Sequence, residues 1–376
     1  MRKILIITGR YLPGWRDGGP VRSILNLTEW LGNEYDLRIM CLDRDHGDTQ
    51  PYSGITTGEY NAVGKAKVFY VERFLPQMIR KLSEEADVVY VCGPYNDYAR
   101  MAMRLKKKGL IQKPLFVASM GSFSPEAFRI KGYKKRIFIA YMKLAHMFDA
   151  VTWSVTSERE EAELKSVIGK DSRCVIARDL PRKGAVSHCG IKNPGQLSVA
   201  FVSRISKKKN LSMIPRILHA ADDNVKIRLD IYGVAEDKEY LKECMESLDE
   251  LRRTHPDCRW KYHGEADSNE VPQIFAEHDA FLFPTLGENY GHVIAESLAA
   301  ECIPIISDTT PWTDLEEKGC GYVCSLNDTP GFAKAVEELA AMDEAAIAAR
   351  REKCREYIEH LNDESVKNTG YRVIFG

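Results

Sequence analysis

The chain has 376 residues, of which 44% are hydrophobic and 28% charged, and its formal net charge at pH 7 is −1. This composition excludes a disordered or fibrous chain, and the near-neutral charge argues against a general nucleic-acid-binding protein. The length exceeds what one hydrophobic core usually serves, so we expect two domains.

The cysteines and the N-terminal segment favour a cytoplasmic protein. Ten cysteines occur without a CxxC pair or a histidine cluster at ligand spacing, which predicts free thiols in a reducing compartment and no zinc site. The apolar run in MRKILIITG is too short for a signal peptide, and no uncharged stretch approaches the ~20 residues that span a bilayer. We therefore expect a cytoplasmic location.

The first half of the chain alternates short apolar runs with helical sequence. A strand is predicted at 3–8, followed by a loop and a helix over 21–31, with Pro20 in its first turn. Further strands are predicted at 36–42, 87–93 and 114–119. Strands that alternate with helices imply a parallel sheet covered on both faces.

A second series of strands follows a linker near 180–195 that is rich in Gly, Pro and basic residues. Its strands are predicted at 197–205, 227–233, 259–265, 280–284 and 303–308. The fold class is therefore α/β, with two doubly wound domains in tandem. The expected domains are 1–185 and 186–356, with a tail, 357–376, that packs back on the first domain.

Polar residues and glycines follow the strands of the second series, at the ends where parallel sheets bind ligands. Arg204 and Gly233 follow two of these strands, and Glu288 lies just beyond the strand at 280–284. Gly291 is expected to open the next helix, whose first N–H groups and positive dipole end favour phosphate. This edge of the sheet is therefore the predicted ligand site.

Two pairs of charged residues belong to this predicted edge. Glu288 and Glu296 have seven residues between them, and beside a phosphate site such acceptor-only groups suit the hydroxyls of a sugar or ribose. Arg204 and Lys209, at a strand-to-helix turn, can neutralise a diphosphate as it leaves. Solvated surface charges are the alternative interpretation of both pairs.

These residues carry a family resemblance. GENYGHVIAE resembles the Glu-x7-Glu signature of the family 4 retaining glycosyltransferases of GT-B fold, and SRISKKKN resembles their Arg-x4-Lys diphosphate motif. RDGGPVRSILNL looks like the donor-facing loop of their N-terminal domain, and IISDTTPWTDLEEKG is similar to a bacterial surface-polysaccharide subgroup. The resemblance implies two Rossmann-like domains facing across a cleft, the first on the acceptor side and the second binding a nucleotide sugar.

The resemblance also implies roles for individual residues. Glu288, Arg204 and Lys209 are the implied catalytic residues, with Glu288 on the donor sugar and Glu296 on the ribose hydroxyls. The other implied donor-binding residues are Gly18, Gly19, Gly233, Asn289, Tyr290, Gly291, His292 and Val293. Many members carry a histidine in the N-terminal domain where this chain has VASMGSFSPEAF. Ser119, Met120 and Gly121 supply no imidazole at that place.

The implied activity is retaining hexosyl transfer from a nucleoside-diphosphate sugar, with UDP preferred, to a lipid-linked saccharide in capsule, exopolysaccharide or O-antigen assembly. The resemblance favours a same-face substitution, and a double displacement is the other route. No cofactor or metal is expected. A sugar-nucleotide 2-epimerase and a non-catalytic sugar-nucleotide-binding protein are the alternatives. A nicotinamide dehydrogenase is disfavoured, because neither strand-to-helix turn supplies GxGxxG with an acidic residue ~20 positions later.

One acidic stretch superficially suggests a metal site. LDRDHGD contains Asp43, Asp45, His46 and Asp48, but it follows the second strand of a domain whose phosphate-binding candidates lie elsewhere. A solvated loop is the preferred interpretation.

Residues 100–143 contain twelve Lys or Arg and one acid, Glu126. The cations are Arg100, Arg104, Lys106, Lys107, Lys108, Lys113, Arg129, Lys131, Lys134, Lys135, Arg136 and Lys143. Within this basic region, YKKRIFIAYMK interleaves cations with apolar residues, as a helix lying on a membrane surface does. We expect this region to dock on the anionic inner face of the cytoplasmic membrane. A core helix with a solvated basic face is the alternative.

Overall fold

The computed structural model describes residues 1–129, 132–184 and 186–376, which form two compact units. Unit 1 consists of Met1–Lys183 and Glu364–Gly376, and unit 2 of Gly184–Asp363. The boundaries predicted from the sequence lie at 185/186 and 356/357. Helix α12 (Glu344–Lys367) runs through the second of these positions without a break.

In its described part, unit 1 is built on an eight-stranded sheet of order β3-β4-β2-β1-β5-β6-β7-β8. Neighbouring strands are parallel, except that β3 and β4 form an antiparallel hairpin. The strands are β1 (Lys3–Ile7), β2 (Asp36–Leu42), β3 (Tyr60–Val63), β4 (Ala66–Val71), β5 (Val88–Cys92), β6 (Leu115–Ala118), β7 (Thr152–Val155) and β8 (Cys174–Ile176). The helices are α1 (Gly19–Leu31), α2 (Pro76–Glu84), α3 (Asp97–Lys107), α4 (Pro125–Arg129), α5 (Gly132–Leu144), α6 (Glu158–Ile168) and α13 (Tyr371–Phe375).

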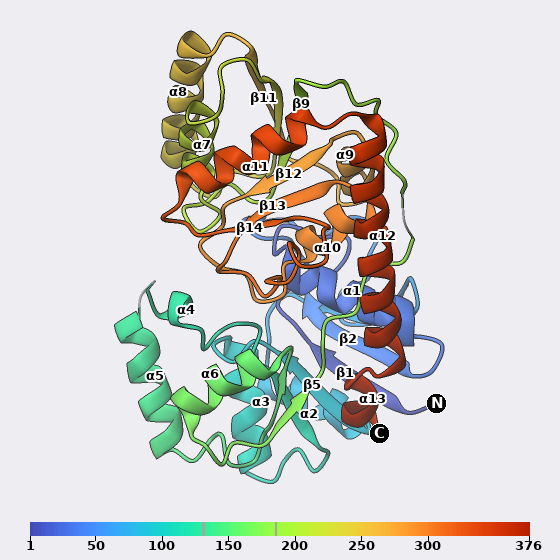
Figure 1. The fold of residues 1–376 in the computed structure, drawn as a ribbon. Coiled ribbons are helices and arrows are strands. Elements are labelled where there is room, and N and C mark those ends of the chain that lie inside the picture. The colour runs from blue at the N-terminus through green and yellow to red at the C-terminus, as the bar shows by residue number, and fades with distance from the viewer. Residues whose placement is uncertain (130–131, 185) are drawn as a thin grey trace. The chain divides into compact units, whose positions relative to one another are not determined.

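Unit 2 is built on a six-stranded, wholly parallel sheet of order β11-β10-β9-β12-β13-β14 over its described residues. The strands are β9 (Gln196–Val202), β10 (Lys226–Tyr232), β11 (Cys258–Gly264), β12 (Ala280–Phe283), β13 (Ile303–Ser307) and β14 (Tyr322–Cys324). The helical elements are η1 (Leu211–Met213), α7 (Ile214–His219), α8 (Lys238–Thr254), α9 (Val271–Ala276), α10 (His292–Ala299), α11 (Thr329–Ala341) and α12. Figure 1 shows α7 and α8 side by side at one end of this sheet, next to β11.

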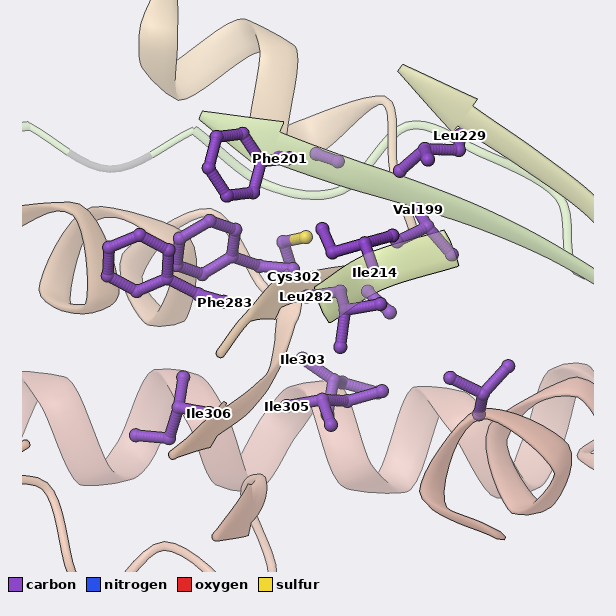
Figure 2. Packing of buried hydrophobic residues seen from close by; sticks show 14 of the residues in the cluster. Val199, Phe201, Ile214, Leu229, Leu282, Phe283, Cys302, Ile303, Ile305 and Ile306 are labelled. Carbon is purple, nitrogen blue, oxygen red and sulfur yellow. The ribbon is translucent and has the colours of Figure 1, made fainter. Parts of the chain in front are cut away.

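The core of unit 2 explains why its central strands consist of unbroken apolar runs. All four residues of β12 and all five of β13 are buried, because helices cover both faces of the sheet. Figure 2 shows Phe201 of β9 and Phe283 of β12 in this core, with Ile305 and Ile306 of β13 below them. The ring centroids of the two phenylalanines are 6.0 Å apart.

The C-terminal segment packs on unit 1. The Phe375 ring in α13 meets the edge of Tyr35 at 5.3 Å between centroids, and Arg372 forms a 2.8 Å ion pair with Glu34. Arg2 donates to the carbonyl of Gly376 at 2.8 Å. These contacts join both ends of the chain to the same sheet.

Within the described residues, none of the helices is both long enough and apolar enough to cross a membrane.

Candidate functional site

The loops after β9 and β12 are joined at the carboxyl edge of the unit 2 sheet. The backbone N–H of Leu286 donates to the carbonyl of Lys208 at 2.8 Å, and the Asn210 amide donates to the carbonyl of Pro284 at 2.9 Å. These bonds place Lys209 opposite Glu288, and the Lys209 Nζ lies 2.6 Å from Glu288 Oε1. The structure therefore brings together two of the three predicted catalytic residues.

The Lys209–Glu288 pair is largely shielded from water. The two side chains are 12% and 11% exposed, and Thr285 Oγ1 donates to the same Glu288 oxygen at 3.0 Å. Burial lowers the pKa of Lys209 below its ordinary value, and Glu288 only partly offsets this. Glu288 thus stabilises the charged form of Lys209 where burial disfavours it. Both contacts use Oε1, so Oε2 can accept a hydrogen bond from a ligand hydroxyl.

The turn before α10 presents backbone at the same edge. Gly291 has φ +85°, a left-handed conformation that suits glycine, and it caps α10 without a side-chain hydrogen bond. The Trp312 indole holds the preceding residue by donating to the Tyr290 carbonyl at 2.5 Å. Since a helix leaves its first N–H groups without intrahelical partners, this end of α10 is suited to bind an anion.

The remaining predicted donor residues of unit 2 belong to this same turn and helix. Asn289 and Tyr290 precede Gly291, while His292 and Val293 form the first turn of α10. Glu296 lies one turn further along the helix and is partly buried. A carboxylate at that position can accept hydrogen bonds from neutral hydroxyls of a ligand bound at the helix end.

Arg204 does not join the Lys209–Glu288 pair. It lies just beyond β9 and forms an ion pair with Glu236, in the loop beyond β10. Gly233, between β10 and this loop, has φ +145°, and an added Cβ would lie 1.7 Å from the Ser203 carbonyl oxygen. Gly233 therefore permits a close approach between the backbones of the two loops, which is a role in the structure of the loop.

Gly18 and Gly19 lie at the start of α1 in unit 1. Gly18 has φ +67°, and a Cβ on Gly19 would meet no atom within 4 Å. The loop before them is held by Asp45, whose Oδ2 accepts from the backbone N–H of Trp15 at 2.9 Å. Asp43 and Asp45 are only 3% and 8% exposed, whereas His46 and Asp48 are exposed, so only the second half of this stretch is the predicted solvated loop.

No group of three or more His, Cys, Asp or Glu residues that could hold a metal ion occurs in the described part of the chain. Asp43 and Asp45 instead have protein partners. Asp43 pairs with Arg44 at 2.8 Å, and Asp45 Oδ1 accepts from the His46 backbone N–H at 2.7 Å. Both carboxylates thus stabilise loops.

The sequence reasoning missed Glu160, a buried carboxylate beneath the segment that replaces the family histidine. Glu160 accepts from Ser119 Oγ at 2.6 Å and the Gly121 N–H at 2.5 Å, and from the Thr156 N–H at 2.7 Å. Between Ser119 and Gly121, Met120 adopts φ +49°, which is uncommon for a residue other than glycine. The sequence does carry a pattern that marks Glu160, because Ser157 and Glu160 have the Ser-x-x-Glu spacing of a helix N-terminus.

The basic region of unit 1 contains a helix with an exposed apolar stripe. Along α5, Tyr133, Ile137, Tyr141 and Leu144 are 65%, 66%, 52% and 83% exposed, while Ile139 and Met142 pack inward. The exposed cations of this helix are Lys134, Arg136 and Lys143. In Figure 1, α5 lies beside α4 at the outer side of unit 1. Lys131 lies outside the described residues.

Some cations of the basic region are engaged by the protein itself. Lys106 donates to the carbonyl of Lys113 at 2.7 Å, Lys107 to that of Ala145 and Lys135 to that of Ala127, both at 2.5 Å. These interactions cap loops and helix ends, so only part of the basic charge is available to a surface outside the chain.

Two parallel-sheet, Rossmann-like units with a phosphate-suited edge define the GT-B fold class, and solved structures of that class confirm the predicted fold. One is described as trehalose-6-phosphate from E. coli bound with UDP-2-fluoro glucose, at 12% identity and TM-score 0.70, with 96% of this chain and 97% of that chain covered. Sucrose-phosphate synthase from Thermosynechococcus elongatus has 14% identity and TM-score 0.69, with 100% and 99% covered. WaaG, described as a glycosyltransferase involved in lipopolysaccharide biosynthesis, has 12% identity and TM-score 0.65, with 97% and 99% covered.

Residues 190–360 match the family model described as glycosyl transferases group 1. The matched segment covers nearly all of unit 2 and includes Arg204, Lys209, Glu288 and Glu296. None of the curated protein sequences matches the chain. The family match supports glycosyltransferase activity, and the solved structures support the fold.

Proposed function

We propose that this chain is a retaining glycosyltransferase that moves a hexose from a nucleoside-diphosphate sugar to a saccharide acceptor. The observation that carries the proposal is the Lys209–Glu288 pair, held beside the N-terminus of α10 within the segment that matches the family model. A shielded cation, a carboxylate and a helix end together provide groups for a diphosphate and for sugar hydroxyls.

Each group has a role in this proposal. The N-terminus of α10 and Arg204 bind the diphosphate, and Lys209 stabilises the negative charge that develops when the glycosidic bond to it breaks. Glu288 accepts a hydrogen bond from a hydroxyl of the donor sugar, and Glu296 holds the ribose. The backbone of Asn289 and Tyr290 lines the sugar and phosphate.

The proposed chemistry is a same-face substitution without a metal. Glu288 already accepts hydrogen bonds from Lys209 and Thr285, and these bonds reduce its reactivity as a nucleophile toward the anomeric carbon. In the same-face route the departing diphosphate oxygen takes the proton of the acceptor hydroxyl. Lys209, Arg204 and the helix end supply the positive charge that a metal ion provides in other transferases.

The preferred donor is a UDP-sugar. One structural neighbour is described as bound with UDP-2-fluoro glucose, and another, Anabaena HepE, as a complex with UDP and glucose. For the acceptor we propose a lipid-linked saccharide of a surface polysaccharide, met at the inner face of the cytoplasmic membrane. The exposed apolar stripe and the cations of α5 support this part of the proposal, since an interfacial helix combines both features.

The function is tested by incubating the protein with radiolabelled UDP-sugars, with and without a bacterial lipid extract as acceptor. If the protein is a transferase, label should appear in the lipid fraction, and the release of UDP should depend on the extract. Conversion of the sugar nucleotide without any acceptor would identify an epimerase. Saturable binding without either reaction would identify a binding protein.

Membrane docking is tested separately by flotation with liposomes that contain phosphatidylglycerol. Each Lys or Arg near an anionic surface contributes ~1 kcal/mol, so a Lys134/Arg136/Lys143→Glu variant should float far less than the unmodified chain at low salt. A Lys242/Arg252/Arg253→Glu variant makes the same charge change on α8 in unit 2 and serves as the control. Equal flotation of both variants would remove the membrane from the proposal.

A further inference from the structure

Arg204, which the proposed function assigns to the diphosphate, forms an ion pair with Glu236. The two side chains lie at the carboxyl edge of the unit 2 sheet and are 45% and 42% exposed. Glu236 has no role in the proposed reaction. It lies beside a cation that, in that reaction, binds an anion.

The backbone specifies this pairing. Beyond β9 and β10 the two segments of the backbone remain paired. The Ile205 N–H donates to the Val234 carbonyl at 2.8 Å, and the Glu236 N–H donates to the Ile205 carbonyl at 3.1 Å. Gly233 is required for the approach, because a Cβ there would lie 1.7 Å from the Ser203 carbonyl oxygen. The backbone pairing thus places residues 204 and 236 next to each other, so their side chains can reach one another.

The other cation of the site has a carboxylate partner of a different kind. Lys209 and Glu288 are 12% and 11% exposed, and Glu288 is further held by Thr285. A shielded pair of this kind is costly to separate, whereas an exposed pair contributes little and exchanges readily. Of the two cations, Arg204 is therefore the one that can leave its carboxylate and turn to a ligand.

We infer that Glu236 is a resident counter-ion of Arg204, which the diphosphate of the nucleotide displaces when it binds. This inference rests on the proposed function, since it presupposes that Arg204 binds the diphosphate. Because the nucleotide must displace Glu236 from Arg204, it binds less tightly than it would to an unpaired arginine. The return of Glu236 to Arg204 favours release of the product nucleotide. Glu236 then tunes affinity without touching the reacting atoms.

The test measures the dissociation constants of UDP, GDP and ADP by titration calorimetry. Glu236→Gln should bind the preferred diphosphate about threefold more tightly, since an exposed ion pair competes only weakly. Arg204→Ala should bind it less tightly, and the Arg204→Ala/Glu236→Gln double variant should match Arg204→Ala. Glu239→Gln, the same charge change three residues along, is the control and should bind as the unmodified chain does.

The outcomes separate the inference from the function on which it rests. Equal or weaker binding by Glu236→Gln, or the same gain in Glu239→Gln, would overturn the counter-ion role alone. A gain that persists when Arg204 is replaced by alanine would also overturn it, because the effect would not act through Arg204. No saturable binding of any of the three nucleotides to the unmodified chain would overturn the proposed function together with the inference.

Discussion

Replacement of Glu288 by glutamine should separate sugar transfer from nucleotide binding. The amide keeps the shape of the side chain but removes the charge that Lys209 Nζ contacts at 2.6 Å, and it changes the acceptor available to a sugar hydroxyl. A hydrogen bond to a charged group contributes roughly 1.5–3 kcal/mol. At about 1.4 kcal/mol per factor of ten, kcat should fall about ten- to a hundredfold.

The same change should reduce stability, because Lys209 then remains in a shielded site without a counter-charge. Removal of one partner of a fully buried pair costs ~3–5 kcal/mol, and the partial exposure of this pair reduces the expected loss to about 1–3 kcal/mol. Urea denaturation measures this loss, and steady-state kinetics with calorimetry measure kcat and the dissociation constant of UDP.

Glu265→Gln, which alters an exposed carboxylate just beyond β11 at the same edge of the sheet, is the matched control. Only Glu288→Gln should lose turnover, while both variants should bind UDP within about threefold of the unmodified chain. Full activity in Glu288→Gln, or a loss of UDP affinity as large as its loss of kcat, would refute the assignment of Glu288 to the donor sugar.

Four further predictions concern nucleotide binding, metal, and pH. Glu296→Ala should weaken UDP binding in calorimetry with little change in kcat, and the reverse pattern would contradict its ribose role. Turnover should survive EDTA, whereas loss on chelation with recovery in Mn²⁺ or Mg²⁺ would show a metal requirement. Because burial lowers the pKa of Lys209 below 10.5, the pH profile of kcat/KM should begin to fall below the pH at which an ordinary lysine titrates. Burial acts to raise the pKa of Asp230, but hydrogen bonds from His278 and His263 outweigh it and lower that pKa from 3.8 to about 2. This shift corresponds to about 2 kcal/mol of folding free energy. A carboxyl whose pKa is lowered on folding stabilises the folded protein at pH values above its unfolded pKa. Asp230→Asn should therefore be less stable than the unmodified chain near neutral pH in urea denaturation. The difference in stability should shrink as the pH falls from about 4 toward 2.

Most of the internal strands were predictable because they are largely buried, whereas the internal strands β4 and β7 were not predicted. The segments predicted at 36–42, 280–284 and 303–308 match β2, β12 and β13 within one residue at each end. Among the strands at the ends of the sheets, β3, β8 and β14 were not specified. They have only three or four residues, and an apolar run of this length is too short to predict a strand.

The contacts at the candidate site were less predictable than its residues. Lys209 and Glu288 are 79 positions apart, and their contact depends on backbone bonds between two loops that no local pattern encodes. The partner of Arg204 depends likewise on the parallel pairing beyond β9 and β10. Residue type and strand position thus predicted which residues lie at this edge of the sheet, whereas their ion pairs required the three-dimensional structure.

The central claim, that the carboxyl edge of unit 2 binds a nucleoside diphosphate, is tested most directly by a thermal-shift panel of UDP, GDP and ADP on the unmodified chain and on Arg204→Ala. A ligand at 100 times its dissociation constant adds about 2.7 kcal/mol to the free energy of unfolding. At least one nucleotide, UDP by preference, should raise the melting temperature of the unmodified chain in a saturable way, with a markedly higher half-maximal concentration for Arg204→Ala. Absence of a saturable shift with all three nucleotides, or an identical response of the two proteins, would contradict the account.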